Sequence, residues 1–355
     1  MTEEFAATRI DRYVVIGAGA VGTALAAGLQ ESGREVVLVS RGATHTAIRE
    51  RGLRFTHDGR TRTLDVEVAD GAAGVELRPG DVLVLAVKSQ DASATLAEWA
   101  WRPVTGGGVA ADLAIVLTQN GLDAERVALR YFGCVIGGVA LVAARHVVPG
   151  EVEVGNAPRI GQLVIGAYPG RAASVPQAGA GASSRSNRSS RSSGYAEQVA
   201  ADLRKANWLC QAVPDIERWL AWKVLSNVTF ALAVLEGPEQ RLAALRQLIL
   251  AETRTVLAAA GHDVADPATE LSHDPGEAAL SPSYGGHRPS TWQSFARGAG
   301  SEVDYLNGEM VLLARLHGLS APANAALQRV LGRSAALGEA PGVHHVDEVL
   351  ALAGG

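Results

Sequence analysis

The sequence predicts an α/β protein with an N-terminal Rossmann-type dinucleotide-binding domain and an all-α C-terminal domain. Three observations lead to this prediction: a glycine-rich turn between a short apolar run and a helix, the buried strand-like runs that follow it, and helical periodicity in the second half. The 355 residues suffice for two domains, each with its own core. We place these domains at residues 1–216 and 217–355.

The composition argues against several classes of protein. A formal net charge of −5 and a pI near 6.0 argue against a nucleic-acid-binding protein. We expect no membrane contact, because no apolar run reaches the roughly 18 residues that a span needs, and the polar start "MTEEFAATRIDR" is no signal peptide. Cys134 and Cys210 lie in apolar runs, which favours buried, reduced thiols in a cytoplasmic protein, with a buried disulfide as the alternative.

The first strand and helix enclose the sequence G-A-G-A-V-G within "RYVVIGAGAVGTALAAGLQESG". Gly17 permits a tight turn, Gly19 allows the backbone to approach a pyrophosphate, and Gly22 allows close packing of helix and strand. The free N–H groups of the helix N-terminus then face the anion. The predicted cofactor-binding turn is Gly17, Ala18, Gly19, Ala20, Val21 and Gly22; a glycine-rich turn without a ligand is the alternative.

The second strand, "EVVLVSRG", ends in Ser40 and Arg41. In NAD-binding proteins of this fold an acid follows this strand, because a carboxylate binds the ribose 2′-hydroxyl. A hydroxyl and a guanidinium suit a 2′-phosphate instead, so the sequence favours NADP as the cofactor. The alternative is that Arg41 is a solvated surface residue.

Polar residues follow the next two strands. "DVLVLAVKSQ" contains Lys88 and "DLAIVLTQNG" contains Asn120, each just past the carboxyl end of a strand. Open α/β sheets bind their ligands at this edge. Strand-like stretches follow in "VIGGVALVAARHVVPGEVEVG" and "RIGQLVIG", and later come a helix near 195–206 and the strand "NWLCQAVPDI".

Residues 170–194 depart from globular composition, because they are nearly all Gly, Ala, Ser and Arg. So little apolar bulk cannot offset the entropy of ordering, which predicts a flexible insertion. Its clustered arginines leave nucleic-acid contact as the alternative, although no aromatic platform accompanies them.

From Glu217 the periodicity is helical. "RWLAWKVLSNVTFALAVLE" predicts one helix that stops at Gly237, and "PEQRLAALRQLILAETRTVLAAAG" predicts a second. "SEVDYLNGEMVLLARLHG", "PANAALQRVLG" and a short stretch near 345–352 predict the remaining helices.

Lys223 and Asn227 stand four residues apart on the first of these helices and so share a face. A lysine beside an asparagine on an apolar helix indicates a lined cleft, where desolvation lowers the lysine pKa and suits it to protonate a carbonyl oxygen. The alternative is a lysine whose stem covers Trp219 or Trp222 and whose head lies in water.

Ser290 and Glu302 flank a loop that leads into a later helix. We expect Glu302 near the first turn of that helix, where the helix dipole also favours an acid for purely structural reasons. A lysine and a carboxylate from different elements would then meet near a dinucleotide.

These motifs, in this order, resemble the ketopantoate reductase (2-dehydropantoate 2-reductase) family over nearly the whole chain. The resemblance rests on the glycine turn, Arg41, Lys88 in a "VK" context, "QNG", the helix "LAWKVLSN", and Ser290 ahead of "SEVDYLNG".

The resemblance implies NADPH as cofactor and a 2-oxo acid as substrate, with hydride transfer to the carbonyl carbon. It implies that Lys223 binds the carbonyl oxygen and delivers the proton, while Glu302 holds a substrate hydroxyl or steers Lys223. It further implies that Asn120, Asn227 and Ser290 orient the substrate and that Lys88 and Asn120 bind at the cofactor end of the cleft. Ketopantoate, reduced to pantoate for pantothenate biosynthesis, is the leading substrate, and a homodimer is left open.

The chain departs from the family pattern at two places. Ala231 stands where the family carries a second asparagine, and Ser294 stands where it often carries an aspartate. One lost polar contact can shift specificity by a few kcal/mol. A different carbonyl substrate is therefore the first alternative, a non-catalytic NADP-binding redox sensor the second, and a 3-hydroxyacid or imine reductase the third. No metal is expected, because the histidine pairs lack metal-ligand spacing.

Overall fold

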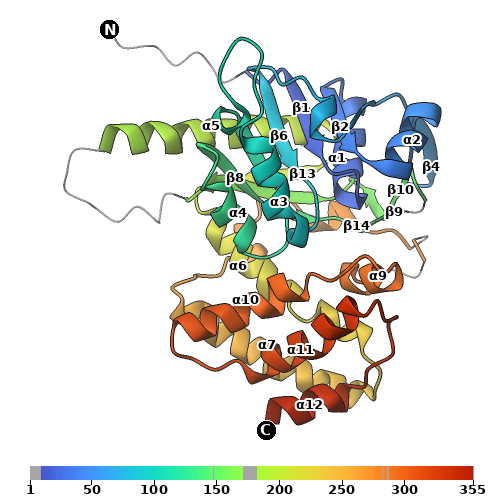
Figure 1. Ribbon diagram of the computed structural model, residues 1–355, viewed down its shortest axis with the longest axis vertical. Coiled ribbons are helices and arrows are strands. Elements are labelled where there is room, and N and C mark those ends of the chain that lie inside the picture. Colours follow the sequence, from blue (N-terminus) through green and yellow to red (C-terminus); the bar gives the residue numbers. More distant parts are fainter. Residues whose placement is uncertain (1–8, 147, 171–181, 283, 286–287, 355) are drawn as a thin grey trace.

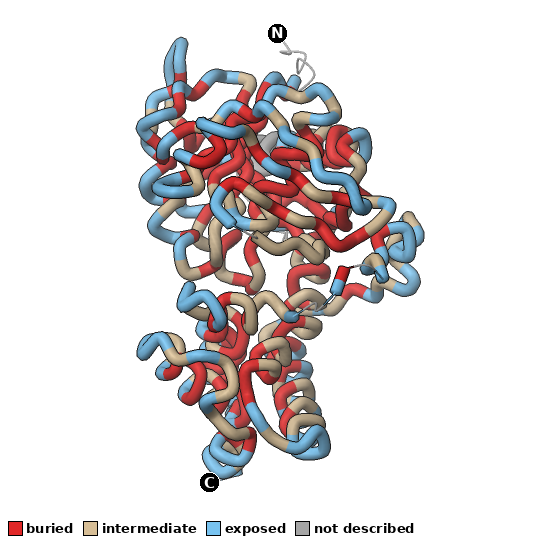
Figure 2. The backbone as a smooth tube through the Cα atoms, turned by 90° about the vertical axis from the view of Figure 1, so that its right-hand side faces the viewer, coloured by how far each residue is buried: buried red, intermediate tan, exposed pale blue. Residues whose placement is uncertain are grey.

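The computed structural model describes residues 9–146, 148–170, 182–282, 284–285 and 288–354. Figure 1 shows two parts: a sheet domain with its helices and, below it, a set of helices that contains the C-terminal end. Buried backbone runs through both parts in Figure 2. The predicted α/β fold with a helical C-terminal domain is confirmed.

The main sheet has the strand order β13-β12-β8-β7-β6-β1-β2-β5. Neighbouring strands are parallel, except that β12 runs antiparallel to β8. The central strands are buried along their whole length, as expected for a sheet covered on both faces. The strands are β1 (Arg12–Ile16), β2 (Glu35–Ser40), β5 (Glu67–Asp70), β6 (Asp81–Leu85), β7 (Ala114–Leu117), β8 (Cys134–Leu141), β12 (Gln162–Tyr168) and β13 (Leu209–Ala212).

Helices cover both faces of this sheet. Alternate residues of β1 point to opposite faces of the sheet and pack in different hydrophobic clusters. Val15 packs in the cluster formed with α1 and α5, whereas Val14 packs in the cluster formed with α3 and α4. The helices of this domain are α1 (Ala20–Glu31), α2 (Gly42–Arg51), α3 (Ser89–Ala100), α4 (Asp123–Ala128) and α5 (Ala182–Lys205), with short 3-10 turns η1 (Ala72–Gly74) and η2 (Ala110–Asp112).

A buried ion pair joins two neighbouring strands of the sheet. Arg12 of β1 donates from Nε and Nη2 to the two carboxylate oxygens of Asp81 in β6, at 2.9 and 2.8 Å. The side chains are 3% and 0% exposed. Each charge is therefore neutralised where water cannot reach it, so that losing either partner would leave an isolated buried charge.

Two smaller sheets were not predicted. One has the order β4-β3-β10-β9, and in the other β11 pairs with β14, which brings a segment of the C-terminal half against the N-terminal half. β9 and β10 lie within the stretch predicted as strand-like, but the pairings of β10 with β3 and of β11 with β14 join segments far apart in the chain, so local patterns carry no sign of these two sheets. They are β3 (Leu53–His57), β4 (Arg60–Leu64), β9 (Ala144–His146), β10 (Glu151–Val154), β11 (Asn156–Pro158) and β14 (Ala278–Leu280).

Helix α5 begins earlier than predicted. Residues 182–194, which we expected within a flexible insertion, form its first half, and residues 171–181 of that stretch lie outside the described residues. Packing accounts for the last part of this stretch: the Arg191 guanidinium lies 5.7 Å from the Tyr195 ring and donates to the main-chain oxygen of Asp112 at 3.0 Å, while the buried Ser192 contacts Cys134. Tertiary contacts thus stabilise a helix that composition alone disfavours.

The C-terminal half consists mainly of helices around one buried cluster. That cluster also contains Val139 of β8 and Val164 of β12, so the first helix, α6, packs against the sheet as well as against its own domain. The elements are α6 (Ile216–Asn227), η4 (Phe230–Val234), α7 (Glu239–Ala259), α8 (Pro267–Glu270), η5 (Pro275–Glu277), α9 (Ser290–Ala296), α10 (Val303–Leu316), α11 (Pro322–Ala336) and α12 (Val346–Gly354).

The helix predicted to run to Gly237 ends at Asn227 and is followed by the 3-10 turn η4. The main-chain oxygen of Val228 accepts a hydrogen bond from Asn307 Nδ2 at 3.0 Å. The β-branched pair Val228 and Thr229 also weakens helix propensity at this point. The Asn307 side chain of α10 thus forms a hydrogen bond with a main-chain carbonyl at the point where α6 ends.

Cys134 and Cys210 are buried free thiols, as predicted. Among the described residues, none of the helices combines the length and apolar character that crossing a membrane requires. The same residues contain no group of three or more His, Cys, Asp or Glu side chains suited to a metal ion.

Candidate active site

The glycine turn has the geometry that its three glycines predict. Gly17 has a φ of +113°, and a Cβ there would lie 2.9 Å from Val87 Cγ1. A Cβ at Gly22 would collide with the main chain of Gly17 and lie 2.9 Å from Ala86 Cβ. Gly19 faces open space, because a Cβ at this position would have no heavy atom of the described residues within 4 Å. The turn is therefore tight on its inner side and open where a pyrophosphate would approach.

Glu302 meets two residues at the carboxyl end of β6. It is the N-cap residue of α10, so the prediction that it lies at the start of this helix is confirmed. Lys88 Nζ donates to Glu302 Oε2 at 2.7 Å, and the Ser89 hydroxyl lies 2.9 Å from Glu302 Oε1. The Glu302 side chain is 5% exposed and that of Lys88 is 37% exposed. A nearly buried carboxylate is thus held from the sheet domain by an ammonium and a hydroxyl.

The "QNG" segment forms a second link between the domains. Asn227 Nδ2 donates to Asn120 Oδ1 at 2.9 Å, and the main-chain oxygen of Asn120 lies 2.8 Å from the Ser89 hydroxyl. A Cβ at Gly121, which has a φ of +106°, would lie 2.7 Å from the main-chain oxygen of Tyr305. The glycine therefore allows α10 to approach the loop closely, and Asn120, Asn227 and Glu302 belong to one connected set of contacts.

Lys223 lies on α6, one turn before Asn227. Burial lowers the pKa of its ammonium group to about 8, while the charge of Glu302 acts in the opposite direction. Among the described residues no hydrogen bond or ion pair is formed by Lys223, so its ammonium has donors to offer a ligand. An ammonium with a pKa of about 8 thus lies within the electrostatic influence of a carboxylate that Lys88 and Ser89 hold in place.

The structure does not bring Ser290 into this set of contacts. Ser290 is the first residue of α9, a helix that occupies part of the stretch expected as a loop. Helix α9 packs against η4, the turn that follows α6. Ser290 therefore lies on an element next to the lysine helix, without a hydrogen bond to Lys223, Asn227 or Glu302 in the part of the chain that is described.

The end of β2 differs from expectation in one respect. Arg41 is not a free cation, because its Nη2 donates to both carboxylate oxygens of Glu98 in α3, each at 2.8 Å. The Ser40 hydroxyl is buried and has no hydrogen-bond partner among the described residues. Both predicted residues lie where the sequence placed them, at the end of β2 and the start of α2.

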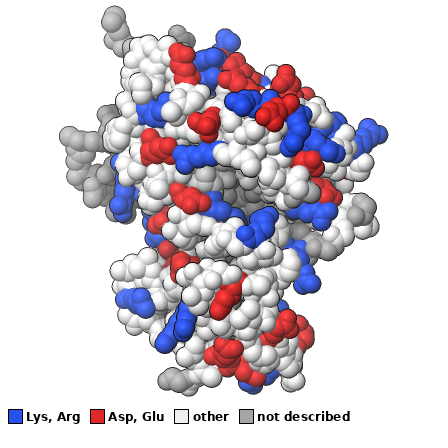
Figure 3. All heavy atoms as spheres, turned by 45° about the vertical axis from the view of Figure 1, so that its right-hand side comes forward, with Lys and Arg blue, Asp and Glu red and all other residues white. Residues whose placement is uncertain are grey.

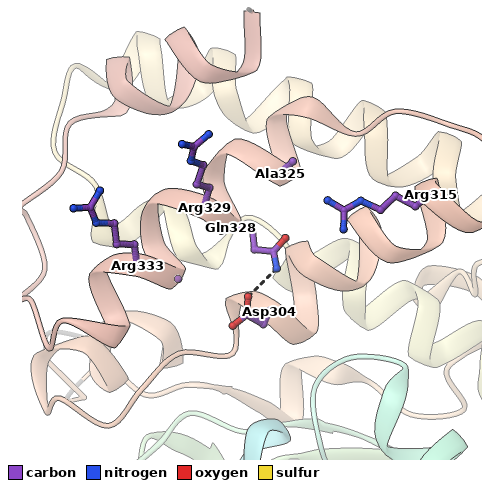
Figure 4. A pocket seen from close by; sticks show the side chains of 7 residues that line it. Asp304, Arg315, Ala325, Gln328, Arg329 and Arg333 are labelled. Atoms are coloured by element: carbon purple, nitrogen blue, oxygen red, sulfur yellow. Dashed lines mark hydrogen bonds between the residues drawn. The ribbon is translucent and has the colours of Figure 1, made fainter.

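The surface is hollowed between the two domains, and Lys and Arg side chains lie around this hollow (Figure 3). An ion pair between Arg126 of α4 and Glu309 of α10 joins the domains as well. A separate pocket of about 440 Å³ lies between α10 and α11, outside the predicted site residues; Figure 4 shows Gln328 donating to Asp304 at 2.8 Å within it. That pocket is lined by Asp304, Arg315, Ala325, Gln328, Arg329, Gly332 and Arg333.

Three residues of the site carry no role in the sequence prediction. Ser89 holds Glu302, Glu98 holds Arg41, and Gln119 Nε2 donates to the main-chain oxygens of Leu85 and Val87 at 2.9 and 3.0 Å. Gln119 precedes Asn120 in "QNG", so the motif itself marks it. Ser89 and Glu98 have no comparable signal, because their partners lie far away in the sequence.

A dinucleotide-type glycine turn and a largely parallel sheet, with a helical domain packed against it, are the features of a dinucleotide-binding protein. The chain belongs to the ketopantoate reductase family: residues 13–170 match the family described as ketopantoate reductase PanE/ApbA, and residues 215–334 match its C-terminal part.

The chain is also similar to individual 2-dehydropantoate 2-reductases and, in fold, to a D-mandelate dehydrogenase. The 2-dehydropantoate 2-reductase of Archaeoglobus fulgidus is 26% identical over 335 residues, covering 90% of this chain and 96% of the relative, and that of Pyrococcus abyssi is 25% identical over 326 residues, covering 88% and 94%. Among solved structures, a ketopantoate reductase from Ralstonia eutropha has a TM-score of 0.68 at 22% identity, covering 92% and 99%. A D-mandelate dehydrogenase solved with NADH and anilino(oxo)acetate has a TM-score of 0.70 at 18% identity with the same coverage, which shows a shared fold.

Proposed function

We propose that this protein is an NADPH-dependent reductase that converts a 2-oxo acid into the 2-hydroxy acid. The observation that carries the proposal is Lys223, an ammonium with a pKa of about 8 that feels the charge of the buried Glu302 carboxylate, on a helix that packs against the sheet of a domain with a dinucleotide-type turn. Membership of the ketopantoate reductase family agrees with this chemistry.

The residues present fit a bound dinucleotide. The open position at Gly19 and the N-terminus of α1 would hold the pyrophosphate, with Gly17, Ala18, Ala20, Val21 and Gly22 forming the rest of the turn. The orphaned hydroxyl of Ser40 and the guanidinium of Arg41 would bind the 2′-phosphate, which favours NADPH over NADH. When bound, the reduced nicotinamide supplies a hydride to the carbonyl carbon of the substrate.

The protein's own residues handle the proton and the orientation. Lys223 would donate a hydrogen bond to the substrate carbonyl oxygen and then transfer its proton, which neutralises the alkoxide as it develops. Glu302, fixed by Lys88 and Ser89, would keep the ammonium protonated and accept a hydrogen bond from a substrate hydroxyl. Asn120, Asn227 and Ser290 would orient the acid, and Lys88 acts through Glu302 rather than on the substrate.

We propose ketopantoate as the leading substrate and a related 2-oxo acid as the alternative. Ala231 is 2% exposed and packs in the core of the helical domain, and Ser294 is also 2% exposed. Ala231 therefore offers no polar group where the family pattern contains an asparagine, and Ser294 offers an uncharged hydroxyl where it often contains an aspartate. A cleft with fewer polar contacts suits an acid with a more apolar side chain, such as the class to which the D-mandelate dehydrogenase ligand belongs.

The test is NADPH oxidation by the purified protein with a panel of 2-oxo acids that includes ketopantoate, phenyl-substituted 2-oxo acids and acids without a hydroxyl. We expect turnover with NADPH to exceed turnover with NADH. Absence of turnover with every acid, together with tight NADPH binding, would favour the non-catalytic redox sensor. A preference for NADH would contradict the assignment of Ser40 and Arg41.

A further inference from the structure

The guanidinium expected to read the 2′-phosphate already has a carboxylate partner. Arg41 Nη2 lies 2.8 Å from both oxygens of Glu98, and the two side chains are 68% and 43% exposed. The Arg41 side chain also lies across Gly71, where a Cβ would be 3.3 Å from Arg41 Nε. Residues from β2, from the turn after β5 and from α3 therefore meet at one point of the surface.

This point is where the two nicotinamide dinucleotides differ chemically. A dinucleotide on the glycine turn places its adenosine ribose at the end of β2, beside Ser40 and Arg41. NADPH carries a phosphate on that ribose and NADH carries a hydroxyl. A guanidinium binds phosphate and carboxylate in the same way, through N–H groups aimed at two oxygens. Glu98 and the 2′-phosphate thus compete for the guanidinium of Arg41.

We propose that Glu98 is a specificity-determining residue for the cofactor, whose carboxylate withholds Arg41 from the 2′-phosphate and so limits the preference for NADPH over NADH. The inference rests on the proposed NADPH-dependent function. An exposed ion pair is weak, so the phosphate can displace Glu98, and the competition reduces NADPH affinity by about two- to fivefold. NADH binding does not need the exchange and is not reduced.

The experiment is a fluorescence titration of NADPH and of NADH at low ionic strength, with dissociation constants as the readout. Glu98→Gln keeps the size of the side chain and removes its charge. We expect this variant to bind NADPH about two- to fivefold more tightly than the wild type, with NADH affinity unchanged. Unchanged or weaker NADPH binding would overturn the inference.

A matched control and a double variant separate the mechanism from a general charge effect. Glu35 forms a similar exposed ion pair with Arg78 at 2.8 Å, from the opposite end of β2, so Glu35→Gln should leave both affinities unchanged. In an Arg41→Gln background, Glu98→Gln should no longer tighten NADPH binding. If Glu98→Gln still tightens NADPH binding in the Arg41→Gln background, the Glu98 carboxylate repels the 2′-phosphate directly. That result would overturn the role of Arg41 as the group for which the two compete.

The proposed function and this inference fail in different ways. If the wild type binds neither dinucleotide, both are wrong. If it binds NADPH and Glu98→Gln changes nothing, the inference alone is wrong and the proposed reductase stands.

Discussion

Two ion pairs at the carboxyl edge of the sheet have the same chemistry and different surroundings. In the pair of Lys88 and Glu302, the carboxylate is 5% exposed, has a second contact with Ser89 and belongs to the other domain. In the pair of Arg41 and Glu98, both side chains are about half exposed or more and belong to one domain. Because solvent screens the second pair, its partners can be exchanged at little cost, whereas the first pair fixes a carboxylate in place. The difference indicates that the pair of Lys88 and Glu302 fixes the position of a carboxylate, whereas the pair of Arg41 and Glu98 can open when a ligand binds.

The largest effect should come from removing the ammonium of Lys223, whose pKa responds to the Glu302 carboxylate of the first pair. Lys223→Ala takes away the proton donor, so we expect kcat for reduction to fall on the order of 10²- to 10⁴-fold with NADPH affinity little changed. Steady-state kinetics and a binding titration measure the two. Lys205→Ala, at an exposed lysine of α5, is the control and should keep full turnover. Full turnover in Lys223→Ala would show that another group donates the proton.

A fully buried pair extends the comparison to stability. Asp81→Ala leaves the Arg12 guanidinium charged and unpaired inside the sheet, which should reduce the free energy of unfolding by about 3–5 kcal/mol. Glu35→Gln, which breaks an exposed pair, should reduce it by less than about 1 kcal/mol. Chemical denaturation measures both. Equal losses in the two variants would mean that burial does not separate these pairs.

Ser89→Ala tests whether Glu302 needs its second contact. The variant removes one hydroxyl hydrogen bond to a charged group and leaves Lys88 in place, so we expect kcat to fall about tenfold. Ser89→Thr, which keeps the hydroxyl, should restore most of the activity. A loss that appears only in KM, or one that threonine does not rescue, would contradict a positioning role.

The smallest expected effect is a shift of the pH profile. We propose Lys223 as the acid in reduction, so kcat/KM should fall as pH rises through its pKa of about 8. Glu302 raises that pKa by its charge, so in Glu302→Gln the fall should begin at lower pH. Profiles of the wild type and of this variant, measured in the same buffers, test the direction. A shift to higher pH would show that the carboxylate does not act on the ammonium.

Local patterns predicted the elements that a few neighbouring residues determine. The glycine turn, the strands β1, β2, β6 and β7 and the helices α7 and α10 follow from glycine spacing and from the period of apolar residues. The same patterns placed Lys88, Asn120 and Glu302 at element ends that belong to one set of contacts, and Lys223 on the helix that carries Asn227.

Contacts between distant segments were the part that sequence could not supply. Ser89 and Glu302 are 213 residues apart, and Arg41 and Glu98 are 57 apart, so nothing in either neighbourhood marks the partner. The helical state of residues 191–194 and the break after Asn227 depend likewise on packing and on the Asn307 hydrogen bond. Secondary-structure propensity is a weak guide wherever tertiary contacts decide.

Helix α6 packs against β8 and β12 while it carries Lys223, and η4 and α9 follow it in the chain. The proposed proton donor is therefore carried by a helix that packs directly on the sheet, whereas Ala231 and Ser290 lie on the later elements η4 and α9. Exchanging residues 228–300 with those of a relative should alter which acid is accepted without moving the donor. The position of the proposed donor and the residues next to it are thus set by different parts of the chain.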